Sequence, residues 1–238
     1  QRQMCIRDRT SPARRHFQRV TAAQAAGDAA EGTPQNGDQY ELMAAALWEA
    51  RRTLKAIKSV QAKIEKKREL LPDFAPYIEG VLQAGSGAQD DVLMTVLVWR
   101  IDVGDLAGAL DIAEYAMKHD LQTPDRYERD TASLIAEEIA ETALKLLAEE
   151  SADAEVLAGI LGTAQALTGD HDMHDEIRAK LLKAQGYAQR DAGYTTAALE
   201  NLQRALSLND RAGVKKDIEK LERCLLYTSD AADDMQCV

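Results

Sequence analysis

The residues with the clearest potential for catalysis are two adjacent carboxylates in the stretch "AQDDVLMT". Asp90 and Asp91, with Asp102 and Asp105 further along, are the residue types that hold Mg²⁺ beside a water nucleophile in metal-dependent phosphodiester cleavage. Acidic residues also favour the first turn of a helix, where they face the positive end of the helix dipole. The sequence therefore leaves two interpretations of Asp90 and Asp91: catalytic residues of a nuclease that uses Mg²⁺, or the start of a helix.

A second group of polar residues, "HDMHDE", places His171 and His174 three residues apart and beside Asp175. Asp172 or His174 also suits the start of the following helix, so we expect no metal site here. The sequence contains no G-x-x-x-x-G-K-S/T loop, and "AGSGAQDD" lacks the lysine that contacts phosphate in such loops. We therefore expect no intrinsic cofactor and no ATP hydrolysis, and any motor activity must come from a partner chain.

Basic residues gather in two N-terminal segments, although the whole chain has a net charge of −11. Residues 10–20 contain three arginines and no acid, and residues 48–69 contain eight basic residues against three acidic ones. An acidic protein needs such segregated basic surface to bind duplex DNA. The alternative is a solvated helix face or a coiled coil. The candidate DNA-binding residues are Arg14, Arg15, Arg19, Arg51, Arg52, Lys55, Lys58, Lys63, Lys66, Lys67 and Arg68.

The composition favours an all-α protein. The 238 residues include only 2 Phe, 2 Trp and 5 Pro, and Ala, Leu, Glu and Lys are frequent. The two ends, residues 1–9 and 224–238, lack a helical period that continues their neighbours and resemble translated sequencing adapters, so we interpret both as artefactual extensions. All 3 cysteines lie in these ends, which argues against a disulfide framework. We expect no membrane-spanning segment and a cytosolic protein.

The periodicity predicts a helical arm and one long helix. Ser11 before Pro12 suits a helix start, and residues 25–38 suit a mobile linker, which makes 10–38 an arm and linker. The pattern of residues 39–71 predicts a single basic helix with a heptad seam, a helix that serves DNA binding or oligomerisation. The alternative is that the seam packs on the rest of the chain. The candidate oligomerisation residues are Met43, Leu47, Leu54, Ile57 and Ile64.

Residues 72–223 predict a domain of helical hairpins. Pro72 and Pro76 are expected to end the long helix and to start a short one. Glycines at 104 and 193, each followed by small residues, predict helix-to-helix bends with close packing. The spacing resembles the tetratricopeptide unit, and plain packing of helices in a globular domain is the alternative. The expected hairpins are 88–103 with 105–119, 130–149 with 153–167, and 173–191 with 195–208, before a last helix to about Arg223.

Four segments together resemble a known family: "TSPARRHFQRV", "RRTLKAIKS", the block from Lys66 to Leu121, and "DEIRAKLLKAQGYAQRDAGYTTAALENLQRALSLNDRAGVKKDIEKLER". They are similar to the small terminase subunit of tailed temperate phages, usually labelled the terminase endonuclease subunit. The resemblance covers nearly all of 10–223 and is weakest over 122–170. It implies partners: double-stranded viral DNA, a large ATPase subunit and further copies of the chain, in the host cytoplasm.

The resemblance also implies an activity, namely cutting concatemeric DNA and starting its packaging into procapsids. The family tends to end in a Lys/Arg-rich tail, which this chain lacks after Arg223. We expect the catalytic carboxylates to belong to the large subunit, so that this chain directs the cut. Two alternatives remain: a tetratricopeptide-like adaptor that does not touch DNA, and an autonomous Mg²⁺-dependent endonuclease that uses Asp90 and Asp91.

Overall fold

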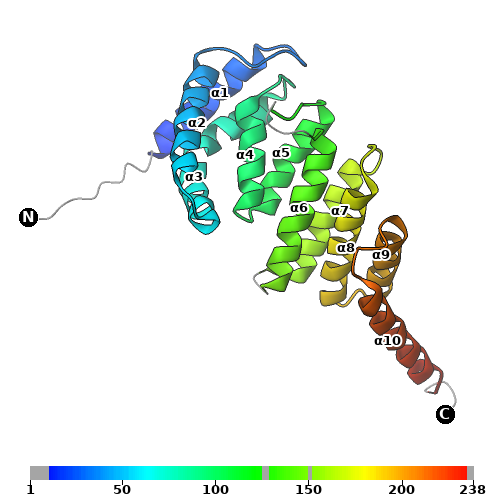
Figure 1. The fold of residues 1–238 in the computed structure, drawn as a ribbon. Coiled ribbons are helices and arrows are strands. Elements are labelled where there is room, and N and C mark those ends of the chain that lie inside the picture. Colours follow the sequence, from blue (N-terminus) through cyan, green and yellow to red (C-terminus); the bar gives the residue numbers. More distant parts are fainter. Residues whose placement is uncertain (1–10, 125–128, 150–151, 235–238) are drawn as a thin grey trace, which may run out of the picture. The chain divides into compact units, whose positions relative to one another are not determined.

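The secondary structure of the protein is helical. In the computed structural model, residues 11–124, 129–149 and 152–234 are described (Figure 1). Within these ranges we find helices and one isolated bridge between Pro34 and Gln89 but no strand, which confirms the all-α prediction. None of the helices in this part of the chain combines the length and the apolar character that crossing a bilayer requires. Residues 1–9, which we interpret as artefactual, lie outside the described residues.

The helices divide between two compact units. The N-terminal unit comprises Gln1–Val103 and Tyr115–Arg126, and the C-terminal unit comprises Gly104–Glu114 and Tyr127–Val238. The helix bounds are α1 Pro12–Gly27, α2 Asp38–Ala56, α3 Val60–Ala84, α4 Asp91–Asp102, α5 Leu106–Lys118, α6 Thr131–Ala148, α7 Ala154–Thr168, α8 Asp175–Asp191, α9 Thr195–Leu208 and α10 Lys215–Asp234.

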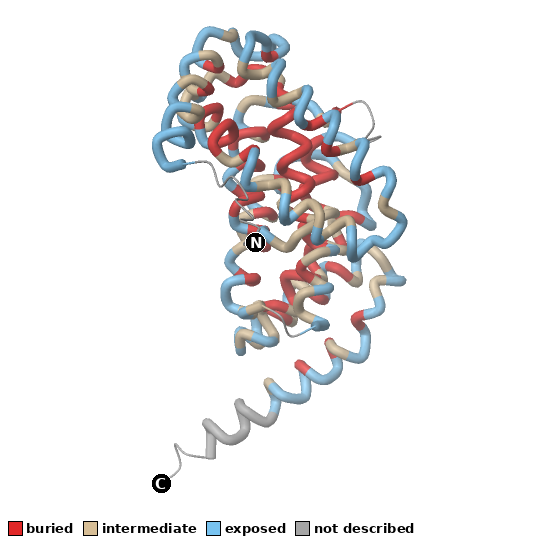
Figure 2. The backbone as a smooth tube through the Cα atoms, turned by 90° about the vertical axis from the view of Figure 1, so that its left-hand side faces the viewer, coloured by how far each residue is buried: buried red, intermediate tan, exposed pale blue. Residues whose placement is uncertain are grey.

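The N-terminal arm is a helix that packs on its own unit. The Ser11 side chain caps α1, and Pro12 occupies its first turn, as predicted. The second half of α1 crosses α3 at Gly80, where an added Cβ would lie 2.6 Å from the Arg19 carbonyl oxygen and 2.7 Å from the Ala22 Cβ. The first half of α1 is exposed, as the pale blue turns that follow the grey N-terminal trace show in Figure 2.

The predicted mobile linker is tethered. Between α1 and α2, the Gln35 amide donates to the Gln89 carbonyl at 2.7 Å, and the Gln89 amide donates to the Thr33 carbonyl at 2.8 Å. Gln35 is buried, and the Glu31 carboxylate lies 2.7 Å from the His119 ring. The prediction of a mobile linker was wrong because backbone hydrogen bonds to a distant loop leave no pattern in the linker's own sequence.

The single long helix predicted over 39–71 is also wrong, because the chain leaves the helical conformation between α2 and α3. Ile57 is extended, and the Ser59 side chain accepts a hydrogen bond from the Ala62 amide as the cap of α3. A serine that caps a new helix competes with continuation of the old one. The heptad seam is therefore interrupted at this break.

Helix α3 runs through both of its prolines. Proline lacks an amide hydrogen and disfavours a helix interior, so we expected the helix to end at Pro72. It continues past Pro72 and Pro76 to Gly85, whose left-handed conformation closes it. The buried side chains that follow Pro72 offset the lost backbone hydrogen bonds by apolar burial. They are Phe74, Tyr77, Ile78 and Val81.

The C-terminal unit has its helices where the sequence predicted them. The bends at Gly104 and Gly193 have φ angles of 84° and 87°, in the left-handed region that glycine adopts without strain. Helices α8 and α9 approach closely at Gly186, where an added Cβ would lie 2.7 Å from the Leu202 side chain. The tetratricopeptide-like character of this unit stays a prediction.

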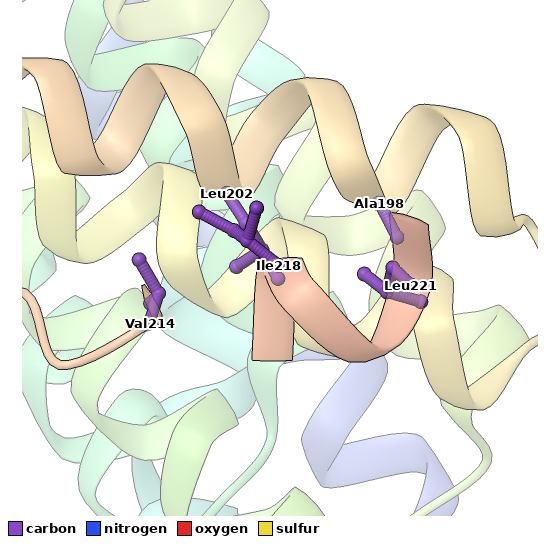
Figure 3. Packing of buried hydrophobic residues seen from close by; sticks show 5 residues of the cluster. All are labelled: Ala198, Leu202, Val214, Ile218 and Leu221. Atoms are coloured by element: carbon purple, nitrogen blue, oxygen red, sulfur yellow. The ribbon is translucent and has the colours of Figure 1, made fainter. Parts of the chain in front are cut away.

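Helix α10 covers one side of α9 with apolar side chains. Figure 3 shows Ile218 and Leu221 of α10 beside Ala198 and Leu202 of α9, with Val214 at the start of the same cluster. All five residues are buried. The helix extends to Asp234, beyond the end at about Arg223 that the sequence predicted.

Candidate functional site

The two units differ strongly in charge. The N-terminal unit contains 17 lysines and arginines against 15 aspartates and glutamates, whereas the C-terminal unit contains 12 against 25. A polyanion such as DNA is attracted to cationic surface and repelled by the acidic unit. The cations that could bind DNA are therefore sought in the N-terminal unit, where all eleven predicted residues lie.

Most of the predicted DNA-binding cations already have partners inside the unit. The Lys67 ammonium, whose side chain is only 17% exposed, pairs with Asp102, and the Arg51 guanidinium donates to the Thr95 hydroxyl at 2.5 Å. The other pairs are exposed and of the kind that contributes little to stability. They join Arg19 to Glu79 at 3.9 Å, Arg52 to Glu49 at 3.6 Å, Lys66 to Glu69 at 3.1 Å and Arg68 to Glu65 at 2.6 Å.

Three lysines without such partners lie around the break between α2 and α3. Lys55 is in the last turn of α2, Lys58 lies in the break, and Lys63 is in the first turn of α3. None of the three pairs with a carboxylate among the described residues, and Lys55 and Lys58 are exposed. The first turn of α3 contains no acid, so its amide groups add positive potential. We call Lys55, Lys58 and Lys63 the turn lysines.

The arm contributes one further cation of this kind. Arg14 is exposed on α1 and pairs with none of the described acids, and Arg15 beside it is exposed as well. The structure thus separates the eleven predicted residues into paired cations and a smaller set whose charge is available to a ligand. Whether any of them contacts DNA stays a prediction.

The first carboxylate of the acidic pair is used inside the protein. Asp90 is fully buried and caps α4: its Oδ1 accepts from the amides of Val92 at 2.8 Å and Leu93 at 2.9 Å. Its Oδ2 accepts from the Tyr77 hydroxyl at 2.6 Å. Burial raises the pKa of Asp90, while these hydrogen bonds oppose that shift by stabilising the charged form. Tyr77 is the residue that sequence analysis missed, because it lies thirteen positions before Asp90.

The surroundings of Asp90 do not suit a divalent cation. Both of its oxygens are engaged by protein donors, and burial together with the negative charge of Asp90 raises the pKa of Tyr77. Burial also raises the pKa of Tyr40, with Asp90 and Asp91 adding to the effect. Over the described ranges, no three His, Cys, Asp or Glu side chains gather in an arrangement that could hold a metal ion. Asp90, buried and engaged through both oxygens, therefore does not fit the Mg²⁺ that a nuclease would require, and a catalytic role for the exposed Asp91 stays a prediction.

The two histidines are exposed, and the seam residues pack within their own unit. His174 is the residue at which α8 begins. Leu47 and Leu54 are buried in the core of the N-terminal unit, and the remaining seam residues, Met43, Ile57 and Ile64, are half-buried. This burial favours the interpretation in which the seam packs on its own chain, and a role for these residues in oligomerisation stays a prediction.

Comparison with known proteins places the chain among phage proteins. Residues 44–176 match the family described as "Phage small terminase subunit". The chain is 49% identical over 216 residues to "Terminase, endonuclease subunit" of Escherichia phage P2, covering 90% of this chain and 85% of that protein. It is 27% identical over 205 residues to "Probable terminase, endonuclease subunit" of Haemophilus phage HP1 (strain HP1c1), covering 80% and 71%. No solved structure matches the chain.

Proposed function

We propose, from the premise that this chain belongs to the phage small terminase subunit family, that it binds the viral DNA and acts with a separate large ATPase subunit. Together the two subunits cut concatemeric DNA and begin its packaging into a procapsid. In this division of labour the small subunit selects and holds the DNA, and the large subunit supplies ATP hydrolysis. The family supports the general role, and the charges of the N-terminal unit support the place at which DNA binds.

The observation that carries the proposal is the unpaired positive charge at the break between α2 and α3. Each ammonium that meets a phosphate releases a counterion, which favours binding at low salt. A cation that is already paired with a carboxylate contributes less binding energy, because either the ion pair must break or the negative carboxylate must come close to the negative phosphate. The turn lysines therefore bind the phosphates, with Arg14 of the arm as a further contact, whereas Lys66, Lys67 and Arg68 are already paired with acids of their own unit.

The acidic C-terminal unit serves a different partner. Its excess of carboxylates repels DNA, but it complements a basic protein surface and speeds encounter with it. We place docking of the large subunit on this unit. DNA and the large subunit therefore bind to two units that differ in net charge.

Cleavage is directed by this chain and performed by the large subunit. The relatives carry the words "endonuclease subunit" in their names, but Asp90 is buried and hydrogen-bonded through both oxygens. A purified full chain should leave supercoiled plasmid intact in the presence of Mg²⁺. If it nicks plasmid alone, and changing Asp90 and Asp91 to asparagine abolishes the nicking while the chain stays folded, catalysis belongs to this chain instead.

The DNA-binding surface is tested with two matched triple variants of the full chain. In one, Lys55, Lys58 and Lys63 are changed to alanine; in the other, Lys66, Lys67 and Arg68 are changed. Both lose three positive charges within residues 55–68, so a nonspecific charge effect is the same in each. Binding to fluorescent duplex DNA should weaken strongly in the first variant and much less in the second, with helical circular dichroism checked for both. The opposite order would refute the turn lysines as the binding surface.

A further inference from the structure

Helix α1 has an apolar stripe that stays largely exposed among the described residues of its unit. Ala13, Phe17 and Val20 recur at steps of four and three, which places them on one side of the helix. The exposed fractions are 65% for Phe17 and 38% for Val20. The opposite side holds Ala22 and Ala26, which are buried against α3. An exposed aromatic within a stripe of this spacing is typical of a helix that docks in a groove.

The same unit contains an apolar groove between α2 and α3. Its volume is about 370 Å³, and its apolar lining is Ala46 and Ala50 of α2 with Leu70 and Phe74 of α3. The polar lining residues are Glu49, Thr53, Lys66 and Asp73. Leu42 lies one turn before Ala46 on the same side of α2 and is 57% exposed, so it extends the apolar surface beyond the groove. The exposed Leu42 and Ala46 beside the half-buried Leu70 form apolar surface of the kind that marks a site of interaction.

The charges around the stripe and the groove are complementary. Helix α1 contains three arginines and no acidic residue. Along the groove, Lys66 pairs with Glu69 at 3.1 Å and Glu49 pairs with Arg52 at 3.6 Å, which leaves Asp73 as the lining acid without a partner among the described residues. A basic helix with an aromatic anchor therefore fits this groove by both polarity and charge.

We propose that the α1 stripe of one copy docks into the α2–α3 groove of a second copy of this chain. In its own unit α1 is fixed to α3 by the close approach at Gly80, and Phe17 stays exposed, so the stripe does not fill the groove of the same chain. The stripe and the groove are different surfaces, which makes the contact head-to-tail: every copy offers an arm to one neighbour and a groove to the other. Such contacts close into a ring or extend as a filament.

This assembly does not use the turn lysines of the proposed DNA-binding surface, whereas Arg14, the further phosphate contact, lies on the docking helix itself. The turn lysines do not line the groove, so loss of DNA binding and loss of assembly are separable outcomes. The contact also replaces the heptad seam as the surface for oligomerisation, because Leu47 and Leu54 of that seam are buried within the unit.

The test uses two single variants of the full chain in sedimentation velocity. Phe17→Asp removes the anchor of the arm, and Ala46→Glu places a charge in the groove; both positions are exposed on helices, so each variant should keep its helical circular dichroism. The wild-type chain should form oligomers, and each variant alone should be monomeric. Mixed, the two variants should form a one-to-one dimer and nothing larger, because the arm of the Ala46→Glu chain still fits the groove of the Phe17→Asp chain.

Trp48→Asp is the matched control. Trp48 is 59% exposed on α2 but lies about 200° around the helix from Ala46, outside the groove. This variant should assemble like the wild type. The proposal is overturned if the wild-type chain is monomeric at its highest soluble concentration. It is also overturned if either groove or arm variant assembles normally, or if their mixture yields no heterodimer.

Discussion

Changing Gly80 to alanine should loosen the arm from the N-terminal unit. The added Cβ would stand 2.6 Å from the Arg19 carbonyl oxygen, 2.7 Å from the Ala22 Cβ and 2.9 Å from the Ala23 amide nitrogen. Two of these atoms belong to the α1 backbone and cannot rotate away, so α1 must move by roughly 1 Å to restore ordinary contacts of about 3.5 Å. The arm and α3 would then lose part of their packing.

The size of the effect follows from two opposing contributions. Overpacking of a tight contact costs about 1–3 kcal/mol. Alanine is favoured over glycine inside a helix by about 1 kcal/mol. The net expectation is a loss of about 1 kcal/mol in the free energy of unfolding of the N-terminal unit.

Gly159→Ala is the control for this prediction. Gly159 lies in α7 with nothing within 4 Å of the position of an added Cβ. Only the higher helix propensity of alanine acts at this position, so the free energy of unfolding of the C-terminal unit should rise by up to about 1 kcal/mol. Urea denaturation followed by circular dichroism measures both variants, and hydrogen exchange of the α1 amides should quicken in Gly80→Ala alone. A Gly80→Ala chain that is as stable as Gly159→Ala, with unchanged exchange in α1, would refute the close approach of α1 and α3.

Three further predictions concern single side chains. Burial raises the pKa of Asp90 in the folded protein, so the stability that this carboxyl contributes is greatest below about pH 4, near the pKa of unfolded aspartate. That stability is lost as the pH rises through the raised pKa of the folded state. Asp90→Asn should remove this pH dependence, as measured by urea denaturation at a series of pH values. Arg51→Ala should destabilise the protein by about 1–3 kcal/mol because the hydrogen bond to Thr95 is lost, whereas Lys58→Ala should stay within about 0.5 kcal/mol; equal thermal shifts would contradict the distinction. Leu202→Ala should cost about 2–5 kcal/mol in chemical denaturation, since Leu202 is fully buried between α8, α9 and α10, and a neutral effect would contradict that packing.

Features encoded by local residue patterns were predictable from the sequence. Glycines at 104 and 193 marked the bends because only a left-handed residue fits there, and the periodicity between them set the helices. Ser11 and Pro12 likewise marked the start of α1. In each case the structural cause lies within a few residues of the feature itself.

Features decided by distant contacts were not predictable. The pairing of residues 33–35 with Gln89 joins segments more than fifty residues apart, and burial of Phe74 and Ile78 carries α3 through its prolines. The candidate site shows the same division. The sequence identified the basic residues, but only the structure reveals that Lys67 faces Asp102 while Lys58 pairs with no acid in the described part of the chain.

The most direct test of the DNA-binding account is the affinity of the full chain for duplex DNA across a salt series. Contact between phosphates and the turn lysines, with Arg14 as a fourth cation, predicts that the logarithm of the binding constant falls with the logarithm of salt concentration with a slope of about −3 to −4. Changing the three turn lysines to alanine should flatten that slope to about −1. Absence of binding at low salt, or an affinity that does not respond to salt, would contradict the central claim that this unit holds DNA through its unpaired cations.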